Sequence, residues 1–483
     1  MNSPIDLHAI TPELVLAGTA CLVLIADLFL PEDGKWLAVP LSAAGLIGTL
    51  AAIVSLLGEH RITLDGSFEV NSFSLLFKGL FAIIGLFVLA ISLDHFRDGK
   101  YYQGEYYFLM LCSLLGGFVI ASSRDLISVF IAIELISIPA FVMTGLRKRD
   151  SRSNEAALKF FLFGVLSSAV MLYGMSLIYG FTGGLTNLGE ISTALAGKAD
   201  EPIVILSVFF IVVGFAFKIS AVPFHFWAPD TYEGAPSPVA AFLSTSSKIG
   251  GFVGLLVLMY AAFPSVAEAW RPAFAALAIL TMTVGNLIAL RQRNIIRLLA
   301  YSGIAQSGYV LVTFALIDPN NLDVTRQAFQ SALIYLAIYG VMDLGAFAAA
   351  VAFARKGGSY FIDDYSGLFQ RNPALALMLA GFLISLAGAP PMAGMWAKLF
   401  VFLAALEAQS YILAIVMGIN AVVAAWYYLA VVKRMFFEQP EAQEPVEVTN
   451  VLYAAMAVAT VALLAFLPGI NFLTEMVERS TPF

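Results

Sequence analysis

Apolar stretches of about 20 residues recur along almost the whole chain and are separated by short polar loops. A helix of this length crosses the hydrocarbon core of a bilayer, so each stretch predicts one membrane span. We place fourteen spans at 10–30, 38–57, 73–94, 106–122, 126–146, 156–180, 202–226, 237–263, 271–290, 295–316, 327–354, 373–405, 411–436 and 451–470. The pattern therefore predicts an all-α polytopic membrane protein, and an even number of spans puts both termini on one side.

The composition supports this fold class and excludes others. Of the 483 residues 60% are apolar and 12% are charged, and the mean hydropathy is +0.87. The longest polar connections, 181–201, 355–372 and 437–450, are too short for a separate catalytic module, so a single transmembrane domain over 1–483 is expected. The chain has no phosphate-binding glycine loop, dinucleotide motif or haem-attachment motif. Cys21 and Cys112 match no metal-ligand spacing, and no basic stripe suggests a nucleic-acid partner.

The basic residues predict the orientation of the chain. With the N-terminus outside, 15 of the 26 Lys and Arg residues fall in the inside loops or at the adjoining span ends, and six in the outside segments or at their adjoining span ends. The remaining five are lysines within the spans. This bias predicts that both termini face away from the cytoplasm. The N-terminal segment has no basic region typical of a secretory signal, so the first span is expected to be retained.

Two parts of the chain resemble each other in organisation. Helices 4–8 (106–263) and helices 9–13 (271–436) form groups of five, preceded by helices 1–3 within 1–105 and followed by helix 14 at 451–470. Because five is odd, the second group would cross the membrane upside down, as in inverted-repeat transporters. The seventh span contains Pro223 and the twelfth contains Pro390 and Pro391. We therefore predict two inverted repeats, each with one helix broken by proline.

Five lysines lie within the predicted spans: Lys78, Lys159, Lys218, Lys248 and Lys398. A charge in the bilayer is costly, so such a residue is buried among protein groups or faces water, and it indicates function by default. Lys218 precedes one break and Lys398 follows the other. A broken helix beside an ionisable group is typical of a midplane ion site. The alternative is a proline kink beside a lysine that snorkels to the surface.

Glu134 is an acid in an almost entirely apolar part of the fifth span. Such a group is protonated or paired, and Lys218 is a plausible partner. At about 7 Å and an effective dielectric of about 20, one charge changes the energy of the other by roughly 2.4 kcal/mol. A pair whose separation changes could therefore drive a proton on and off the lysine. The alternative is an ion pair that only fixes helix packing.

The other candidates allow two interpretations each. Lys248 follows the hydroxyl-rich segment 244–247, which could organise water around it. Lys159, near the inner end of its span, could be auxiliary or could snorkel, and Lys78 is expected to be structural. His225 could relay protons or be a bonded structural histidine. The acids Asp27 and Asp343 are also expected to be buried, without an assigned partner.

Three motifs carry a family resemblance. They are residues 223–238 (PFHFWAPDTYEGAPSP), 297–308 (RLLAYSGIAQSG) and 388–394 (GAPPMAG), the last followed by Lys398. Together they resemble the antiporter-like subunits of respiratory complex I. The fourteen spans, the lack of a long C-terminal lateral helix and the lysine in the twelfth span are similar to subunit N of bacterial NADH:quinone oxidoreductase. The segment 159–183 is similar to that subunit as well.

The resemblance implies a proton channel made of two half-channels. It implies that Glu134 is the acid of the fifth span, Lys218 the lysine of the seventh, Lys248 a connector and Lys398 the lysine of the twelfth. It also implies a translocase subunit without redox chemistry of its own, in a hetero-oligomer in the bacterial inner membrane with both termini periplasmic. FMN, iron–sulfur clusters, the NADH site and the quinone site would belong to partner subunits.

Two other functions remain open on the sequence. The same helices could serve a multi-chain sodium/proton antiporter, which would lack flavin and iron–sulfur partners. A quinone-binding or purely structural scaffold would make the buried lysines matter for assembly or quinone affinity rather than for pumping.

Overall fold

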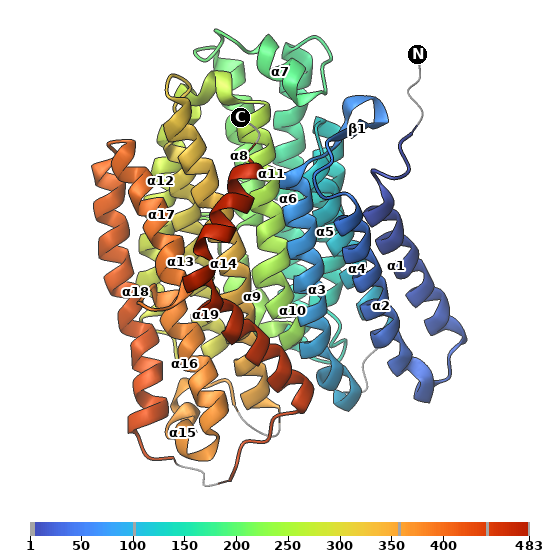
Figure 1. The fold of residues 1–483 in the computed structure, drawn as a ribbon, viewed down its shortest axis with the longest axis vertical. Helices are drawn as coiled ribbons and strands as arrows, with labels where there is room; N and C mark the ends of the chain where they lie inside the picture. The colour runs from blue at the N-terminus through green and yellow to red at the C-terminus, as the bar shows by residue number, and fades with distance from the viewer. Residues whose placement is uncertain (1–4, 100–102, 356–358, 441–443, 482–483) are drawn as a thin grey trace.

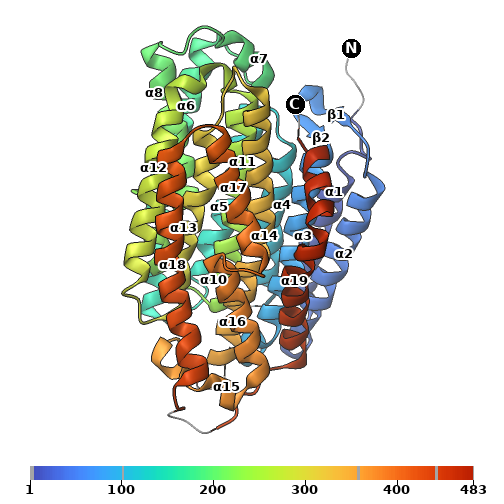
Figure 2. The same cartoon turned by 60° about the vertical axis from the view of Figure 1, so that its left-hand side comes forward.

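The computed structural model describes residues 5–99, 103–355, 359–440 and 444–481. Long helices lie side by side along the longest axis of the molecule, with α1 and α2 at one edge and α18 at the other (Figure 1). The N-terminal part contains α1 (Thr11–Phe29), η1 (Glu32–Leu37), α2 (Ala38–Ser55), β1 (Arg61–Thr63), η2 (Leu64–Gly66), β2 (Phe68–Val70) and α3 (Ser72–Gly99). The start of α1 and the end of α19 (Asn450–Arg479) lie at the same end of the bundle (Figures 1 and 2).

The first predicted repeat contains α4 (Gln103–Ser122), α5 (Leu126–Thr144), α6 (Ser151–Phe181), α7 (Leu188–Ala194), α8 (Pro202–Lys218), α9 (Trp227–Gly234), α10 (Ser237–Phe242), the π-helical turn η3 (Leu243–Ser247) and α11 (Lys248–Ala261). The second contains α12 (Ala267–Ala289), α13 (Ile295–Ala315), α14 (Leu322–Ala354), α15 (Leu368–Arg371), α16 (Pro373–Ala387), α17 (Ala393–Glu407) and α18 (Tyr411–Phe437). Two 3₁₀ turns, η4 (Pro264–Val266) and η5 (Ile362–Tyr365), complete the described helices.

Within the described residues, eleven helices are long and apolar enough to cross a membrane, or up to twelve if the bent α19 counts as one span. The difference from the fourteen predicted spans lies largely in the seventh and twelfth. The seventh predicted span, 202–226, contains α8, which already ends at Lys218. The twelfth, 373–405, is divided into α16 and α17. The breaks predicted from proline are therefore present, and each leaves an apolar helix shorter than a full span.

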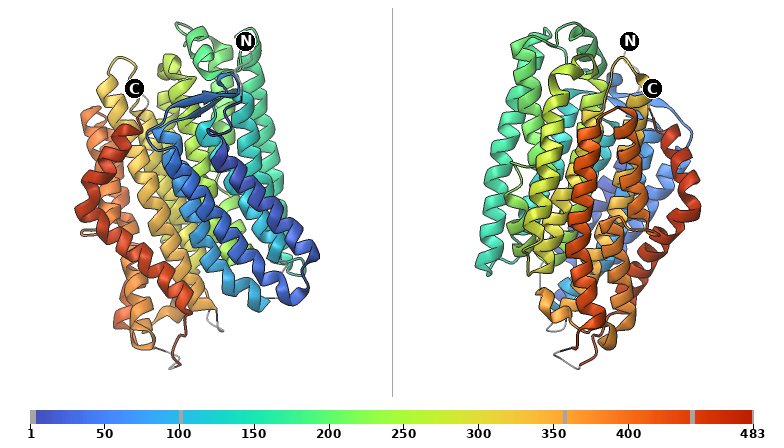
Figure 3. Two further views of the ribbon diagram at one scale, coloured as in Figure 1. Left: turned by 45° about the vertical axis from the view of Figure 1, so that its right-hand side comes forward. Right: turned by 90° about the vertical axis from the view of Figure 1, so that its left-hand side faces the viewer.

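The bundle has a distinct centre. In the apolar 18-residue stretch of Ser237–Ala261, 100% of the residues are buried. The buried share of the corresponding stretch is 89% in both α13 and α14, but only 28% in α6. α19 contacts both α3 and α14 and so joins the N-terminal helices to the second repeat (Figure 3). The most buried helices are therefore α11, α13 and α14, and a polar side chain facing inward from them is removed from lipid.

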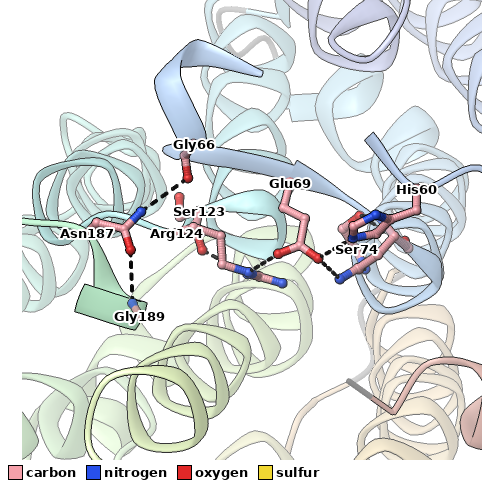
Figure 4. Close-up of polar contacts among 9 residues, drawn as sticks. His60, Gly66, Glu69, Ser74, Ser123, Arg124, Asn187 and Gly189 are labelled. Carbon is pink, nitrogen blue, oxygen red and sulfur yellow. Dashed lines mark hydrogen bonds and ion pairs between the residues drawn. The ribbon is translucent and has the colours of Figure 1, made fainter. Parts of the chain in front are cut away.

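A short antiparallel hairpin, β1–β2, closes one end of the bundle near α5. Glu69 accepts a hydrogen bond from Arg124 Nε at 2.6 Å and lies 2.9 Å from both His60 Nε2 and Asn71 Nδ2 (Figure 4). Partial burial acts to raise the pKa of Glu69, but these partners outweigh it and hold the pKa below its ordinary value. Because Arg124 directly precedes Asp125, the N-cap of α5, the pair fixes the hairpin to the start of that helix.

Candidate functional site

Lys218 is the last residue of α8 and is 3% exposed. The helix stops here because Ser220 adopts a left-handed conformation, with φ of 58°, and Pro223 follows. Lys218 Nζ donates to Ser137 Oγ on α5 at 2.8 Å, and its stem packs so closely on α11 that a Cβ on Gly251 would lie 2.9 Å from its Cγ. Lys218 lies in the last turn of α8, where the helix dipole favours a basic residue.

Glu134 lies on α5 one turn before Ser137, and it is half-buried. Its Oε1 accepts from Ser168 Oγ on α6 at 2.5 Å. Among the described residues, Glu134 forms no ion pair with Lys218 within 4.0 Å, so the pairing predicted from the sequence would act across a wider gap. The two groups are neighbours through α5, since Lys218 binds the hydroxyl of the residue three positions along from Glu134.

Lys248 begins α11 directly after the π-helical turn η3 and is 1% exposed. Its Nζ has no hydrogen-bond partner among the described residues. The hydroxyls of Ser244 and Thr245 donate to the carbonyl of Ala241, and neither accepts a hydrogen bond from the ammonium group. Nζ points at α13, where a Cβ on Gly303 would lie only 2.8 Å from it. A glycine is therefore required at that point for the lysine to keep its position.

Lys398 lies in the second turn of α17 and is 8% exposed. Its Nζ donates to the carbonyls of Leu386 at 3.0 Å and Ala387 at 2.8 Å. These are end carbonyls of α16, which the break leaves without helical partners. Gly388 ends α16 with φ of 84°, and a Cβ there would lie 2.7 Å from Lys398 Cδ. Both broken helices, α8 and α16, thus end at a buried lysine.

One helix, α13, contacts the surroundings of all three lysines. Ser307 Oγ donates to the carbonyl of Ile219, next to Lys218. Gln306 Nε2 donates at 2.9 Å to the Leu386 carbonyl that also binds Lys398. The third contact is Gly303, against which Lys248 is packed. The motif at 297–308 supplies these residues, but the sequence alone assigned them no role.

Hydroxyl and amide groups extend from Gln306 across the second repeat. Tyr335 on α14 donates to Gln306 Oε1, and Gln306 Nε2 lies 3.4 Å from the Tyr428 hydroxyl on α18. The Tyr428 hydroxyl is hydrogen-bonded in turn to Ser302 on α13. The chain of groups connects the Lys398 region with the first half of α13. Apart from Gln306 and Ser302, which lie in the motif, nothing in the sequence distinguishes these residues from ordinary core positions.

Lys159 lies away from the three central lysines. Its side chain is 41% exposed and forms ion pairs with Glu155 at 2.8 Å and Asp230 at 2.9 Å. Asp230 also binds Arg297 at 3.0 Å, so it joins α6, α9 and α13 at the surface. Burial acts to raise the pKa of Asp230, but hydrogen bonds from the two cations outweigh it and lower the pKa. The geometry favours an anchoring role for Lys159.

Two other candidates also lie outside the central group. Lys78 Nζ is 2.7 Å from Glu13 on α1 and 4.9 Å from the ring centroid of Phe68, an arrangement that suits the structural role expected for it. Asp27 finds a partner in Lys35 at 3.5 Å. His225 is 5% exposed and packs on Phe226, and no described contact joins it to Lys218.

The described residues contain no group of three or more His, Cys, Asp or Glu side chains that could hold a metal ion. The interior instead contains ammonium groups and hydroxyls, which can bind and pass protons, and freed carbonyls, which accept hydrogen bonds. Broken helices beside buried charges are typical of multi-pass membrane transporters, and the structure belongs to this class.

Comparison with known proteins identifies the family. Residues 123–424 match the family model described as "NADH:quinone oxidoreductase/Mrp antiporter, TM", and the chain belongs to this family. It is 40% identical over 433 residues to NAD(P)H-quinone oxidoreductase subunit 2 of Thermosynechococcus vestitus, covering 89% of this chain and 82% of the relative. It is 37% identical to the subunit of the same name from Gloeobacter violaceus, covering 99% and 94%.

Solved structures agree with this assignment. A chain of respiratory complex I from Thermus thermophilus, solved with bound aureothin, superposes with a TM-score of 0.80 at 30% identity, covering 96% of this chain and 98% of that one. A chain of the Mrp complex from Dietzia sp. gives a TM-score of 0.86 at 19% identity, covering 99% and 97%, and shows the fold alone. The protein is therefore a multi-pass, antiporter-like membrane subunit, as the sequence motifs predicted.

Proposed function

We propose that this chain is the proton-translocating subunit N of a complex I-type NADH:quinone oxidoreductase. The family membership, the names of the relatives and the 30% identity to a complex I chain support this assignment. Partner subunits would hold FMN, the iron–sulfur clusters and the quinone site, and this chain would contribute no redox chemistry. It would lie in a bacterial inner membrane with both termini periplasmic, as the distribution of basic residues predicts.

The observation that carries the mechanism is the placement of Lys218, Lys248 and Lys398. All three are at most 8% exposed, and one helix, α13, runs past the surroundings of each. The hypothesis is that a proton enters from the cytoplasm near Lys218, passes through water and Lys248, and reaches Lys398 before it leaves to the periplasm. In each step one lysine loses an N–H bond and the next gains one.

We assign the coupling between electron transfer and proton transport to the electrostatic interaction of Glu134 with Lys218. Glu134 has no cation partner within 4.0 Å among the described residues, so its negative charge acts on Lys218 through space. A movement of α5 or α6 that changes this separation changes how strongly Lys218 holds its proton. Partner subunits that pack against these helices could impose such a movement. His225 stays an auxiliary candidate at the α8 break.

The alternative is a subunit of a multi-chain sodium/proton antiporter. The similarity to the Mrp chain is at 19% identity and concerns the fold, whereas the relatives at 37–40% identity are quinone oxidoreductase subunits. Co-purification separates the two functions. Flavin and iron–sulfur subunits that co-purify with a tagged form of this chain support the proposal, and a complex without them supports the antiporter.

The pumping role is tested in inverted membrane vesicles that contain the assembled complex. The ratio of protons taken up to NADH oxidised is measured for Lys218→Ala and Glu134→Ala. Lys159→Ala is the matched control, because this lysine is also in a span but forms surface ion pairs. The ratio is expected to fall in the first two variants only. If both complexes assemble and keep the wild-type ratio, these residues do not carry the proton.

A further inference from the structure

Asp343 on α14 is, among the described residues, the most deeply buried acid that the proposed route does not use. It is 0% exposed, and neither carboxylate oxygen has a hydrogen-bond partner among the described residues. The Lys248 ammonium group, 1% exposed, is in the same situation. A buried polar group without a partner costs free energy, and an isolated buried charge costs more. Two such groups of opposite charge therefore need an explanation.

The helices place these two groups face to face. Tyr339 and Asp343 are four residues apart on α14, and Ser244 and Lys248 are four residues apart on η3 and α11, so each pair shares one helix face. The Tyr339 hydroxyl joins the two faces by donating to the Ser244 carbonyl at 2.9 Å. A Cβ on Gly303 would lie 2.8 Å from Lys248 Nζ and 3.1 Å from the Tyr339 hydroxyl, so both atoms lie next to Gly303 on α13.

The remaining groups around Asp343 do not neutralise it. The hydroxyls of Ser244 and Tyr339 lie beside the carboxylate, but they donate to the carbonyls of Ala241 and Ser244. The other titratable neighbours are the phenols of Tyr232 on α9 and Tyr428 on α18. The charge that acts on Asp343 is that of Lys248, across a gap that is too wide for an ion pair within 4.0 Å.

We propose that Asp343 is a proton-carrying group that exchanges a proton with Lys248, an inference that rests on the proposed function. In the exchange an N–H bond of the ammonium group breaks and an O–H bond forms on the carboxylate, directly or through a hydrogen-bonded water. Both groups are then neutral, and the reverse step restores both charges without any electron transfer. The neutral state removes the cost of two buried, unpaired charges, so Lys248 can both receive and release its proton within the protein interior.

The test compares Asp343→Asn, Lys248→Ala and the double variant in the assembled complex. Asparagine has nearly the same shape as aspartate but cannot take up a proton. Asp343→Glu is the conservative rescue. Asp27→Asn is the matched control, because it makes the same chemical change at an acid that pairs with Lys35 away from the lysines. NADH oxidation and proton uptake are measured together in inverted vesicles.

We expect Asp343→Asn to reduce the number of protons that this chain transports per NADH oxidised at least about tenfold. The same reduction is expected in Lys248→Ala. The double variant should be no worse than either single variant, since both act in one step. Glutamate should restore pumping, and Asp27→Asn should leave it unchanged. A wild-type ratio in Asp343→Asn beside a reduced ratio in Lys248→Ala overturns this inference and leaves the proposed function intact. Wild-type ratios in both variants count against the proposed function as well.

Infrared difference spectroscopy covers the case in which Asp343→Asn does not assemble. The carboxyl band assigned through its shift in Asp343→Glu should also shift in Lys248→Gln, because the proton-exchange partner is lost. A carboxyl band that does not shift in Lys248→Gln contradicts the proposed proton exchange between Asp343 and Lys248.

Discussion

The pair Glu13–Lys78 offers a sharp test of which intramembrane lysines are structural. Lys78 Nζ lies 2.7 Å from Glu13, and the two side chains are 0% and 10% exposed. The perturbation removes the acid alone in Glu13→Gln, the cation alone in Lys78→Met, and both in the double variant. Each replacement roughly preserves the volume of the side chain, so that changes in charge dominate the effect.

The structure sets the expected size of each effect. At 2.7 Å and an effective dielectric of about 20, the attraction is about 6 kcal/mol, which acts against the cost of desolvating both groups. Glu13→Gln leaves the fully buried ammonium group without a carboxylate and should destabilise the protein by about 3–5 kcal/mol. Lys78→Met should cost less, because the partly exposed Glu13 can bind a proton. The double variant should be near wild type, since replacing a buried pair by neutral groups is often neutral.

The assay is the thermal midpoint of the detergent-purified complex, measured for the four members of this cycle. The expected order places Glu13→Gln lowest and the double variant close to wild type. The proton-to-NADH ratio of every variant that assembles should be unchanged. The structural role of the Glu13–Lys78 pair is refuted if Glu13→Gln is as stable as wild type, or if the stable double variant pumps fewer protons. The latter result would place Lys78 on the proton route.

Three further predictions concern α13 and the hairpin. Gly303→Ala should impair pumping with little loss of stability, because the new methyl group pushes the flexible end of Lys248 aside by some tenths of an ångström. Assembly of the variant complex checks the stability, and proton uptake checks the pumping. Gln306→Leu should slow pumping because it removes both the amide N–H that shares the Leu386 carbonyl with Lys398 and the oxygen that accepts from Tyr335. Gln306→Glu keeps only the acceptor for Tyr335 and should keep part of the rate, and initial rates of proton uptake check both variants. The lowered pKa of Glu69 stabilises the hairpin above the ordinary Glu pKa of about 4.3, and this stabilisation is lost as pH falls through the lowered value. The protection of the 61–70 amides, measured as exchange relative to the intrinsic rate at the same pH, should therefore fall in acid in wild type but not in Glu69→Gln.

Sequence reasoning located the two helix breaks because proline leaves a local signal. Pro223 and the pair Pro390 and Pro391 mark both of them, and the lysines beside the breaks were evident. The partners of buried charges were not predictable in the same way. Glu13 and Lys78 lie 65 positions apart on different helices, and only packing brings them together.

The hydrogen-bond partners of two buried acids were not predictable for the same reason. The sequence suggested Lys218 as an electrostatic partner of Glu134, but it did not show that α5 directs Ser137 to the lysine and Glu134 to Ser168. Asp343 had no assigned partner, and the packing of α14 on η3 and α11 turns it toward Lys248. Helix rotation about its axis decides such contacts, and in spans that are apolar on all sides the periodicity of the sequence does not reveal it.

In the proposed mechanism Lys218, Lys248 and Lys398 carry the proton. The decisive experiment measures the proton-to-NADH ratio of the assembled complex in which all three lysines are replaced by methionine. Methionine is apolar and of similar length, so the triple variant removes the ammonium groups from the interior while the helices stay packed. We expect normal NADH oxidation with a lower ratio of protons to NADH. An assembled triple variant that pumps at the wild-type ratio would contradict it.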